Sequence, residues 1–563
     1  MREKKWEQTV WPGTDPKVPE LPDRPIFEEI RRQAALRPEK TAINFYGREI
    51  SYGMLDSLSD RFARALSDLG VEKGDRVGIY LENCPQFAIA FYGILKIGAV
   101  AVTCSPMYRS DELEYELKDA GVYVLIIEDP FYKVLAGVAP EVRPGHVIVT
   151  SFSDFLPKTP EIPLHETMPP GKQYIEGTLD FAALLQEAGD QALPRVDINL
   201  EKDLALLQYT AGTTGHPKGA MLTHGNLAVH GRIVRHYYEY QTSDVHLLIL
   251  PVFHVTGLDI AMNPALAQGS TLIMMARFDL VTMLDVISKF RVTHMVTIAP
   301  VNIAVVNFPG SENCDFSSLR LVLSGGAPVP LEIHEKWQKI TGTPLVEGYG
   351  LSECTGGIIG NNCQNHWPGT VGGPVYFHDI RLVDNDTGLD AEKDRPGELW
   401  IKGPCVMKGY WQAPDQTASV LTGDGWLKTG DIASVDPKGR VRIEGRLKEM
   451  IKVSGYSVFL EEIDAVLIRH EAVLETATIG IPHPYRGEEP KSFIVLKNDF
   501  QGKITQEDII AFCKEKMAAY KYPRQVAFID ALPKSGAGKV LRRALKEMTM
   551  NQCPPAEPED LNR

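Results

Sequence analysis

Apolar residues recur at two different periods along this chain, and the two periods predict its helices and strands. Between residues 55 and 70 the spacing is three or four, with apolar side chains at Leu55, Leu58, Phe62, Leu66 and Leu69. That spacing predicts an amphipathic helix, and Gly70 can end it because glycine readily adopts positive φ. Short uninterrupted apolar runs, such as residues 76–80, instead predict buried strands.

Predicted strands and helices alternate through most of the first 325 residues. We expect strands at residues 76–80, 99–103, 123–127, 204–208, 245–250, 271–275, 294–298 and 319–323. Helices are expected at residues 85–97 and from Ser110 onward, between the early strands. This alternation predicts parallel sheets with helices on both faces.

The pattern changes twice in the second half. From residue 373 to 444 strands dominate, as at 380–383 and 398–401, which predicts a small barrel-like β subdomain. Beyond Gly445 a compact α+β domain is expected, with helices at 458–469 and 506–517 and strands at 476–481 and 492–495. The proline-rich residues 156–172 predict a loop, and the last residues predict a disordered tail.

Residues 87–104 form an apolar stretch that is nearly long enough to span a bilayer. Lys96 and Gly98 interrupt it, so a helix followed by a buried strand is favoured over a transmembrane segment. The first residues carry charge but no apolar core, and no secretory signal is expected from them.

Composition limits the class of protein. A chain of 563 residues is too long for one hydrophobic core, so several domains are expected. The net charge of −14 argues against nonspecific binding of nucleic acid. The eight cysteines include no C-x-x-C pair, which favours free thiols in a reducing compartment and a cytoplasmic location.

The richest chemistry lies in residues 209–219, YTAGTTGHPKG, directly after a predicted buried strand. Glycines let backbone N–H groups converge on an anion, threonine hydroxyls donate to phosphate oxygens, and Lys218 adds positive charge. A flexible surface loop would not need that lysine between Pro217 and Gly219. The segment is not a Walker A loop, since Pro217 comes directly before the lysine and Gly219 directly after it.

Three later segments contain side chains suited to a nucleotide. In residues 347–353, EGYGLSE, Tyr349 offers a flat aromatic face and Glu353 a hard oxygen ligand for Mg²⁺. Asp431 has two acceptor oxygens, which suit a vicinal diol. The glycine turn at 324–328 follows a strand, and by itself it is equally typical of a structural turn.

Five motifs in one order resemble those of the adenylate-forming superfamily, which comprises acyl-CoA synthetases, luciferases and nonribosomal adenylation domains. They are the segments at 209–219, 347–353, 426–431, 445–452 and 533–543, and the resemblance extends over nearly the whole chain. Two positions depart from the usual pattern, because Ser352 stands where threonine is usual and Ala211 where serine is common.

The resemblance implies a specific domain arrangement. A large N-terminal domain, 1–445, would contain two doubly wound α/β subdomains at about 1–190 and 191–372 and a distorted β-barrel subdomain at about 373–445. Residues 446–448 would be a hinge with Lys448 as its pivot. A small α+β domain, 449–563, would rotate about that hinge.

The resemblance also implies roles for individual residues. ATP and AMP would be bound by Thr210, Thr213, Thr214, Gly215, Lys218, Gly325, Gly326, Ala327, Glu347, Gly348, Tyr349, Gly350, Ser352, Asp431, Arg446 and Lys539. The catalytic residues would be Lys539, Glu353, Lys218 and His254, with Mg²⁺ on Glu353 and Thr210. The acyl group and CoA would be bound by His254, Gly257, Lys452 and Gly455.

The predicted activity is an AMP-forming acid–CoA ligase that uses ATP, Mg²⁺ and CoA. His254 stands where amino-acid-activating relatives carry aspartate, so we favour a fatty acid of medium or long chain. An aryl acid is the alternative, followed by a luciferase-like monooxygenase and a catalytically dead nucleotide sensor. Peripheral membrane contact and the choice between monomer and homodimer stay open.

Overall fold

The computed structural model describes residues 18–552 except 169–170, 190–192, 194–195, 211–216, 393–394, 454–455, 484–485, 520 and 536–538. The chain divides into two compact units. The first comprises Met1–Ile380 and Ile401–Leu427, and the second comprises Arg381–Trp400 and Lys428–Arg563. The predicted disordered tail lies outside the described residues.

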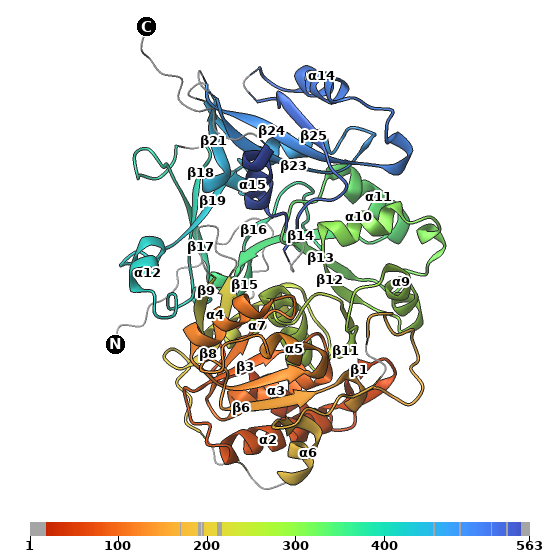
Figure 1. The fold of residues 1–563 in the computed structure, drawn as a ribbon, viewed down its shortest axis with the longest axis vertical. Helices are drawn as coiled ribbons and strands as arrows, with labels where there is room; N and C mark the ends of the chain where they lie inside the picture. Colours follow the sequence, from red (N-terminus) through yellow and green to blue (C-terminus); the bar gives the residue numbers. More distant parts are fainter. Residues whose placement is uncertain are drawn as a thin grey trace. The chain divides into compact units, whose positions relative to one another are not determined.

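The first unit contains a seven-stranded sheet in the order β7-β6-β5-β3-β4-β8-β9 (Figure 1). All its pairs are parallel except the hairpin of β8 and β9. The strands are β3 (Arg76–Tyr80), β4 (Val100–Thr103), β5 (Val122–Glu128), β6 (His146–Thr150), β7 (Leu179–Asp180), β8 (Leu204–Thr210) and β9 (Lys218–Thr223).

A nine-stranded sheet in the order β16-β15-β14-β13-β12-β10-β11-β1-β2 completes the first unit. Its central strands are parallel, whereas β15, β16 and β2 pair antiparallel at its two ends. The strands are β1 (Thr41–Phe45), β2 (Arg48–Ser51), β10 (Val245–Leu248), β11 (Thr271–Met274), β12 (His294–Ile298), β13 (Leu321–Gly325), β14 (Leu345–Leu351), β15 (Gly356–Gly360) and β16 (Gly373–Pro374).

The two sheets are interleaved along the chain, which differs from the predicted division near residue 190. β1 and β2 belong to the later sheet, because β1 pairs in parallel with β11. β8 and β9 belong to the earlier sheet, because β8 pairs in parallel with β4. Period alone cannot reveal such exchanges, since pairing partners far apart in the chain leave no local pattern.

The first unit also contains helices, and α12 among them has no buried residue. They are α1 (Ile26–Leu36), α2 (Tyr52–Asp68), α3 (Pro85–Lys96), α4 (Ser110–Ala120), α5 (Tyr132–Leu135), α6 (Phe181–Glu187), α7 (His224–Tyr237), α8 (Asn263–Gln268), α9 (Leu280–Lys289), α10 (Ala299–Asn307), α11 (Leu331–Thr341) and α12 (Pro414–Val420).

The apolar stretch at 87–104 forms α3 and β4, as predicted. Every residue of α3 is buried, because the helix packs against α2 on one side and β3 and β4 on another. A helix enclosed in this way is apolar all round. Within the described residues, no helix has both the length and the apolar character needed to cross a membrane.

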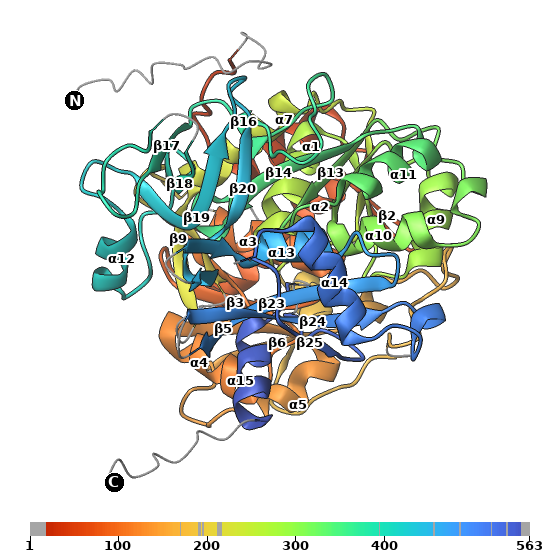
Figure 2. The ribbon, with the colours of Figure 1, turned by 90° about the horizontal axis from the view of Figure 1, so that it is seen from above.

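The second unit contains two sheets. Its four-stranded sheet, in the order β17-β18-β19-β20, is formed by β17 (Asp379–Val383), β18 (Gly397–Lys402), β19 (Leu427–Val435) and β20 (Val441–Arg446). The other sheet, in the order β22-β21-β24-β23 with β25 beside β24, is formed by β21 (Met450–Val453), β22 (Tyr456–Phe459), β23 (Val473–His483), β24 (Gly487–Leu496) and β25 (Gln525–Phe528). Figure 2 shows β23, β24 and β25 side by side in blue.

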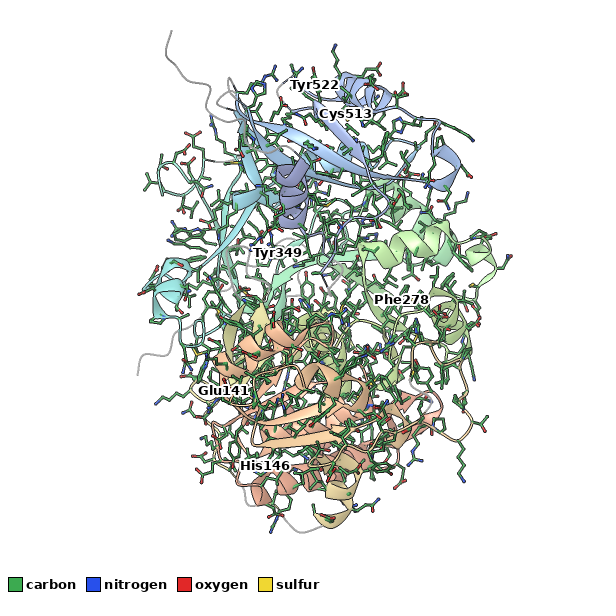
Figure 3. All side chains as sticks on the ribbon, viewed as in Figure 1. Glu141, His146, Phe278, Tyr349, Cys513 and Tyr522 are labelled. Carbon is green, nitrogen blue, oxygen red and sulfur yellow. The ribbon has the colours of Figure 1, made fainter. Side chains whose placement is uncertain are left out.

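Helices α13 (Leu460–Leu467), α14 (Gln506–Lys516) and α15 (Arg542–Gln552) accompany the five-stranded sheet. Cys513 and Tyr522, labelled in Figure 3, belong to its apolar core. The helix predicted at 458–469 begins two residues later, because Tyr456–Phe459 pairs with β21 as a strand. The predicted domain boundary at 445–449 stays a prediction, since the compact second unit also includes the four-stranded sheet.

Candidate active site

The glycine-rich segment connects the two strands of one hairpin. β8 ends at Thr210 and β9 begins at Lys218, and these residues face each other in the antiparallel register. Thr210 Oγ1 donates to Lys218 O at 3.5 Å. The predicted contacts of Thr213, Thr214 and Gly215 fall outside the described residues. The hairpin places the two ends of the loop next to each other, one with a hydroxyl and one with an ammonium side chain.

Side chains cap the start of α7. Thr223 Oγ1 accepts a hydrogen bond of 3.1 Å from Asn226 N, and Asn226 Oδ1 accepts one of 2.8 Å from Thr223 N. This reciprocal pair satisfies N–H groups at the helix start that have no intrahelical partner. Strand β9 itself was not predicted, because its sequence lacks a clear alternation.

Tyr410 connects two of the predicted site residues. Its hydroxyl donates a hydrogen bond of 2.8 Å to Glu353 Oε1, and Lys218 Nζ lies 4.9 Å from the centre of its ring. That separation is within the range of a cation–π interaction. Burial and the charge of Glu353 raise the pKa of Tyr410, so its hydroxyl keeps its proton and remains a donor.

Backbone pairing explains why Tyr410 lies there. Met221 N donates to Gly409 O at 2.9 Å, and Trp411 N donates to Gly219 O at 2.8 Å, so the segment around Tyr410 pairs with β9. Sequence reasoning missed this residue. The Gly409-Tyr410-Trp411 segment is an aromatic signal, but nothing local indicates that it meets a carboxylate 57 positions away.

The residues predicted to hold Mg²⁺ fit that ion. Glu353 lies in η5 (Ser352–Cys354), directly after β14, and Met407 N donates to its carbonyl at 2.8 Å. Its carboxylate and the Thr210 hydroxyl are hard oxygen donors, which Mg²⁺ prefers. One carboxylate with substrate phosphates is a common magnesium environment, so this donor set suits a metal–nucleotide complex.

Two glycine motifs lie at the carboxyl ends of neighbouring parallel strands. Residues 325–327 follow β13 and residues 348–350 end β14, and in the parallel register Ser324 lies beside Glu347. Ligands of open α/β sheets bind at this edge. Tyr349, labelled in Figure 3, is displayed from β14, where a bulge separates its pairing from that of Gly350.

Glu347 has a structural function that its motif did not indicate. One carboxylate oxygen accepts from Val329 N at 3.0 Å, and the other lies 2.9 Å from His334 Nε2 and 3.2 Å from Gly369 N. The carboxylate therefore holds the turn after β13 and the loop before β16. Its predicted nucleotide contact stays a prediction, and Ser352 is buried nearby in η5.

The two residues predicted to bind the acyl group, His254 and Gly257, lie at the start of a rare type of helix. Thr256 N donates to His254 Nδ1 at 3.2 Å, which leaves the proton of the neutral ring on Nε2. The following residues, Thr256–Met262, form the π-helix η3, a feature frequent at functional sites. Gly257 is required, because a Cβ there would overlap with the carbonyl oxygen of Pro251.

Two buried ionisable groups lie beside this helix. Asp259 is in η3 and accepts a hydrogen bond of 2.7 Å from Asn263 Nδ2, and burial raises its pKa to about 8. His230 lies 3.1 Å from Gly357 O, and burial lowers its pKa to about 4. Both groups are therefore mainly neutral at pH 7, because burial disfavours their charged forms.

The second unit pairs two predicted nucleotide-binding residues. Asp431 on β19 and Arg446 on β20 are opposite each other in the antiparallel register, and Arg446 Nε lies 3.4 Å from Asp431 Oδ1. Lys448 follows within η6 (Leu447–Glu449). Lys452 is on β21, but its side chain and the whole of Gly455 lie outside the described part of the chain.

Lys539 stands at the end of a closed loop in the second unit. Ser535 N donates to Lys539 O at 2.7 Å, and Leu541 N donates to Pro533 O at 2.8 Å. Lys534 forms an isolated antiparallel bridge with Val540. These contacts bring the two ends of the loop together, and they place Lys539 three residues before the start of α15.

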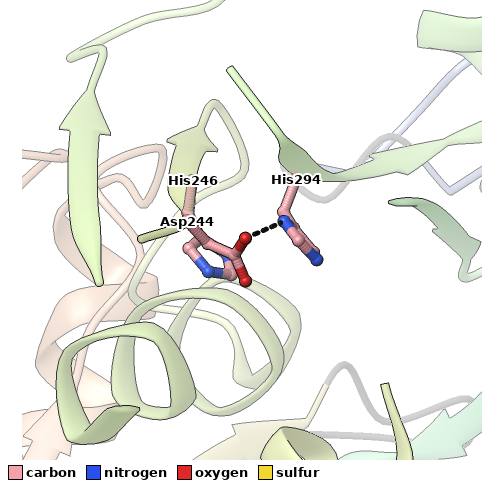
Figure 4. A group of neighbouring side chains, drawn as sticks. All are labelled: Asp244, His246 and His294. Carbon is pink, nitrogen blue, oxygen red and sulfur yellow. Dashed lines mark ion pairs between the residues drawn. The ribbon is translucent and has the colours of Figure 1, made fainter. Parts of the chain in front are cut away.

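One buried cluster has the composition of a metal site but not its geometry. Asp244, His246 and His294 gather on β10 and β12, as Figure 4 shows, and both imidazoles are neutral because burial lowers their pKa values. The two rings stack with centres 4.8 Å apart and planes 27° apart, so their in-plane lone pairs cannot converge on one ion. Arg320 Nη1 already binds Asp244 at 2.8 Å. We interpret the cluster as structural.

With this geometry established, comparison with known proteins assigns the family. The pattern of the AMP-binding enzyme family matches residues 30–411, and that of the AMP-binding enzyme C-terminal domain matches residues 462–539. The chain belongs to the AMP-binding enzyme family. The predicted relationship to adenylate-forming acyl-CoA synthetases is therefore confirmed.

Similar sequences in this family include long-chain-fatty-acid–CoA ligases. Those of Bacillus subtilis (strain 168) and Yersinia pestis are each 37% identical, over 549 and 532 residues. The alignments cover 95% and 92% of this chain and 97% and 93% of those proteins. The 4-coumarate–CoA ligase 5 of Oryza sativa subsp. japonica is 32% identical over 96% of this chain and 97% of its own.

Solved structures of the family share the fold. The anthranilate CoA ligase AuaEII in complex with anthranoyl-AMP has a TM-score of 0.85 at 27% identity, covering 95% of this chain and 98% of its own. ATP-bound MatB from Rhodopseudomonas palustris has a TM-score of 0.82 at 27% identity, covering 93% and 99%. These likenesses confirm the predicted α/β fold class and the predicted class of enzyme.

Proposed function

We propose that this protein is an ATP-dependent long-chain fatty-acid–CoA ligase. It activates the acid as acyl-AMP with release of pyrophosphate and then transfers the acyl group to CoA, giving acyl-CoA and AMP. The observation that carries the proposal is the arrangement of Lys218, Tyr410 and Glu353 at the phosphate hairpin of an AMP-binding enzyme.

In the first half-reaction an oxygen of the fatty acid carboxylate attacks the α-phosphorus of ATP, and pyrophosphate leaves. The negative charge that develops on the phosphate needs fixed positive groups. We assign that role to Lys218 at the hairpin and Lys539 in the second unit. Glu353 and Thr210 would hold Mg²⁺, which supplies further charge stabilisation when bound.

His254 suits the acid end of the substrate. Its Nε2–H can donate a hydrogen bond to the substrate carboxylate, since Nδ1 accepts from Thr256 N. The backbone of this segment is also fixed from β8, because Gln208 Nε2 donates to Phe253 O at 3.0 Å. The residue before His254 is therefore bound to β8, at a position two residues before Thr210.

In the second half-reaction the CoA sulfur attacks the acyl carbonyl carbon, the thiol proton is lost to solvent, and AMP leaves with the electron pair of the broken bond. We propose that the small domain turns about Lys448 between the two steps, moving Lys539 away and bringing Lys452 and Gly455 to the pantetheine route. Asp431 would bind the ribose hydroxyls with its two carboxylate oxygens.

A fatty acid is favoured over an aryl acid as substrate. Long-chain-fatty-acid–CoA ligases from several bacteria are 32–37% identical to this chain, and the two at 37% exceed the 32% of the coumarate ligase. The neutral states of Asp259 and His230 beside η3 also agree with an apolar acyl group. A dead sensor is disfavoured because Glu353 and Lys539 are both retained.

The test is a product assay across a series of acids. Purified protein with ATP, Mg²⁺ and CoA is given saturated acids of graded chain length, then benzoate and coumarate. We expect AMP and pyrophosphate in equal amounts, with the highest rate for a medium or long chain. ADP as the stoichiometric product would overturn the adenylation mechanism, and a preference for aromatic acids would overturn the substrate.

We further propose a cytoplasmic location and, as partners, the carboxylic acid, ATP and CoA but no nucleic acid, with peripheral membrane contact and the choice between monomer and homodimer left open. All seven cysteines that the structure describes are free thiols, and five of them are buried, which suits a reducing compartment. Light output with a luciferin and oxygen would instead support a monooxygenase.

A further inference from the structure

Arg542 is the centre of a charged network in the second unit. Its three nitrogens bind different groups on separate segments of the chain. Nη1 lies 2.6 Å from Glu449 Oε2 and 3.2 Å from Glu461 Oε1, and Nη2 lies 2.7 Å from Asp464 Oδ2. Nε donates to Thr478 O at 3.0 Å. A planar guanidinium is suited to such a fork of fixed hydrogen bonds.

The partners of Arg542 all follow Lys448 in the chain. Glu449 is the residue directly after it, Asp464 is on α13 and Thr478 is on β23. Residues before Lys448 approach the same network more loosely: a Cβ at Gly445 would lie 2.5 Å from Glu461 Oε2, and the charge of Arg446 helps to lower the pKa of Glu449. Arg542 therefore links the C-terminal side of the predicted hinge to the body of the small domain.

Arg542 also fixes the loop that carries Lys539. Only Val540 and Leu541 separate the two residues, and the bond between Leu541 N and Pro533 O closes the loop just before α15. The other strand of the loop is attached independently, since Lys534 Nζ lies 2.7 Å from Glu475 Oε1 on β23. A displacement of Arg542 would be transmitted to Lys539 through two residues of extended chain.

The charges of the network show that it is tightly held. Burial opposes ionisation of Arg542, but Asp464, Glu461 and Glu449 together raise its pKa. Burial raises the pKa of Glu461 to about 8, so this carboxyl keeps a proton at pH 7 and shares it with Glu449. Burial also raises the pKa of Asp464, and Arg542 opposes that rise. Loss of the guanidinium would therefore leave these buried carboxyl groups without their cationic partner.

We propose that Arg542 is a positioning residue for adenylation, making the residue after the hinge and the Lys539 loop move as one rigid body. When the small domain turns about the hinge, the orientation of the chain at Glu449 then sets the position of Lys539 at the α-phosphate. This inference rests on the role of Lys539 in the proposed function. Arg542 itself touches neither substrate nor nucleotide in this scheme.

The experiment compares two half-reactions in single-turnover assays on the full-length protein. Pyrophosphate release reports formation of acyl-AMP, and a supplied synthetic acyl-AMP with CoA reports thioester formation. Arg542→Lys keeps the charge but loses the fork, and we expect it to slow adenylation about 10- to 100-fold, the scale that a misplaced catalytic group costs. Thioester formation should change by less than about threefold, because Lys539 is withdrawn in that step.

Three further variants make the outcome decisive. Arg543→Gln is the matched control, since Arg543 is exposed and pairs with Glu547 one turn away, and both half-reactions should stay normal. Glu449→Gln removes the hinge-side charge at nearly constant shape, and it should give the same asymmetric loss even if Arg542→Lys fails to fold. Lys539→Ala provides the reference for a complete loss of the lysine.

Each result has one meaning. Equal slowing of both half-reactions by Arg542→Lys and Glu449→Gln, or no slowing of either, would overturn the inference and leave the network purely structural. If Lys539→Ala slows adenylation while these two variants do not, the proposed function stands and only the inference fails. If Lys539→Ala itself leaves adenylation normal, the proposed role of Lys539 fails together with the inference.

Discussion

At the scale of single residues, the proposed chemistry depends on a few charged groups held by neutral neighbours. Lys218 and Glu353 meet through Tyr410, whose hydroxyl binds the carboxylate and whose ring lies beside the ammonium. A hydrogen bond to an ionised acceptor is stronger than one between neutral groups. Tyr410 therefore orients the carboxylate, and because its hydroxyl is neutral it does not cancel the negative charge of Glu353.

Lys539 gives the first prediction at this scale. Lys539→Ala should slow acyl-AMP formation by roughly 10²–10³, the usual cost of losing one electrostatic stabiliser of a transition state. Thioester formation from supplied acyl-AMP should be much less affected, because no charge develops on phosphorus in that step. Single-turnover measurements of both steps check this, and an equal loss in both would place Lys539 in a structural role.

His254 gives the second prediction. His254→Asp should lower kcat/KM for the preferred fatty acid, raising the activation free energy by about 1–3 kcal/mol, because a half-buried carboxylate repels the substrate carboxylate and lacks a partner. It should not create activity with amino acids. The control is His254→Asn, which is neutral, still accepts from Thr256 N and should retain more activity. Unchanged kinetics in both variants would place His254 outside the acyl pocket.

At the scale of secondary structure, two glycines that look equivalent in the sequence have different surroundings. Gly348 and Gly350 flank Tyr349 in β14. A Cβ at Gly350 would overlap with Gly356 O on β15, whereas a Cβ at Gly348 would lie 3.3 Å from Ile359 O. Of the two, only Gly350 has no room for any side chain.

We therefore expect opposite outcomes from two matched substitutions. Gly350→Ala should force β15 away at the turn leading to Glu353, lowering stability by about 1–3 kcal/mol and weakening ATP binding. Gly348→Ala should be tolerated with nearly normal binding. Chemical denaturation and calorimetric titration with ATP check both effects. Similar behaviour of the two variants would mean that the β14–β15 turn does not control the nucleotide site.

Elements with a clear local period were predictable, and elements defined by distant partners were not. β3 and β12 have the predicted bounds, and α2 ends before Gly70, whose φ of 84° is the conformation that glycine was expected to supply. β9 and β22 were missed, because short strands of mixed composition are recognisable only from their pairing partners. The motif order indicated the family, but the contact of Tyr410 with Glu353 required the fold.

At the scale of the whole molecule, the proposed mechanism requires two arrangements of the small domain. Lys448 lies between β20 and β21, where Gly445 packs close to Glu461 and Phe459. A turn at Lys448 must change these contacts, while the Arg542 network beyond it stays intact. The backbone of Lys448 then has to adopt two conformations, as hinge residues do.

Lys448→Pro tests this requirement, because proline fixes φ near −65° and removes the N–H. We expect the variant to be trapped in the arrangement that adenylates, so pyrophosphate release in a single turnover should be near normal. Thioester formation should slow at least tenfold, about 1.4 kcal/mol in barrier.

Lys448→Ala removes the same side chain but keeps the backbone free, so it should leave both steps nearly normal. This pattern is the reverse of that expected for Lys539→Ala. If Lys448→Pro left both steps intact, the pivot would lie elsewhere, and if it abolished both in a folded protein, alternation about Lys448 would be wrong.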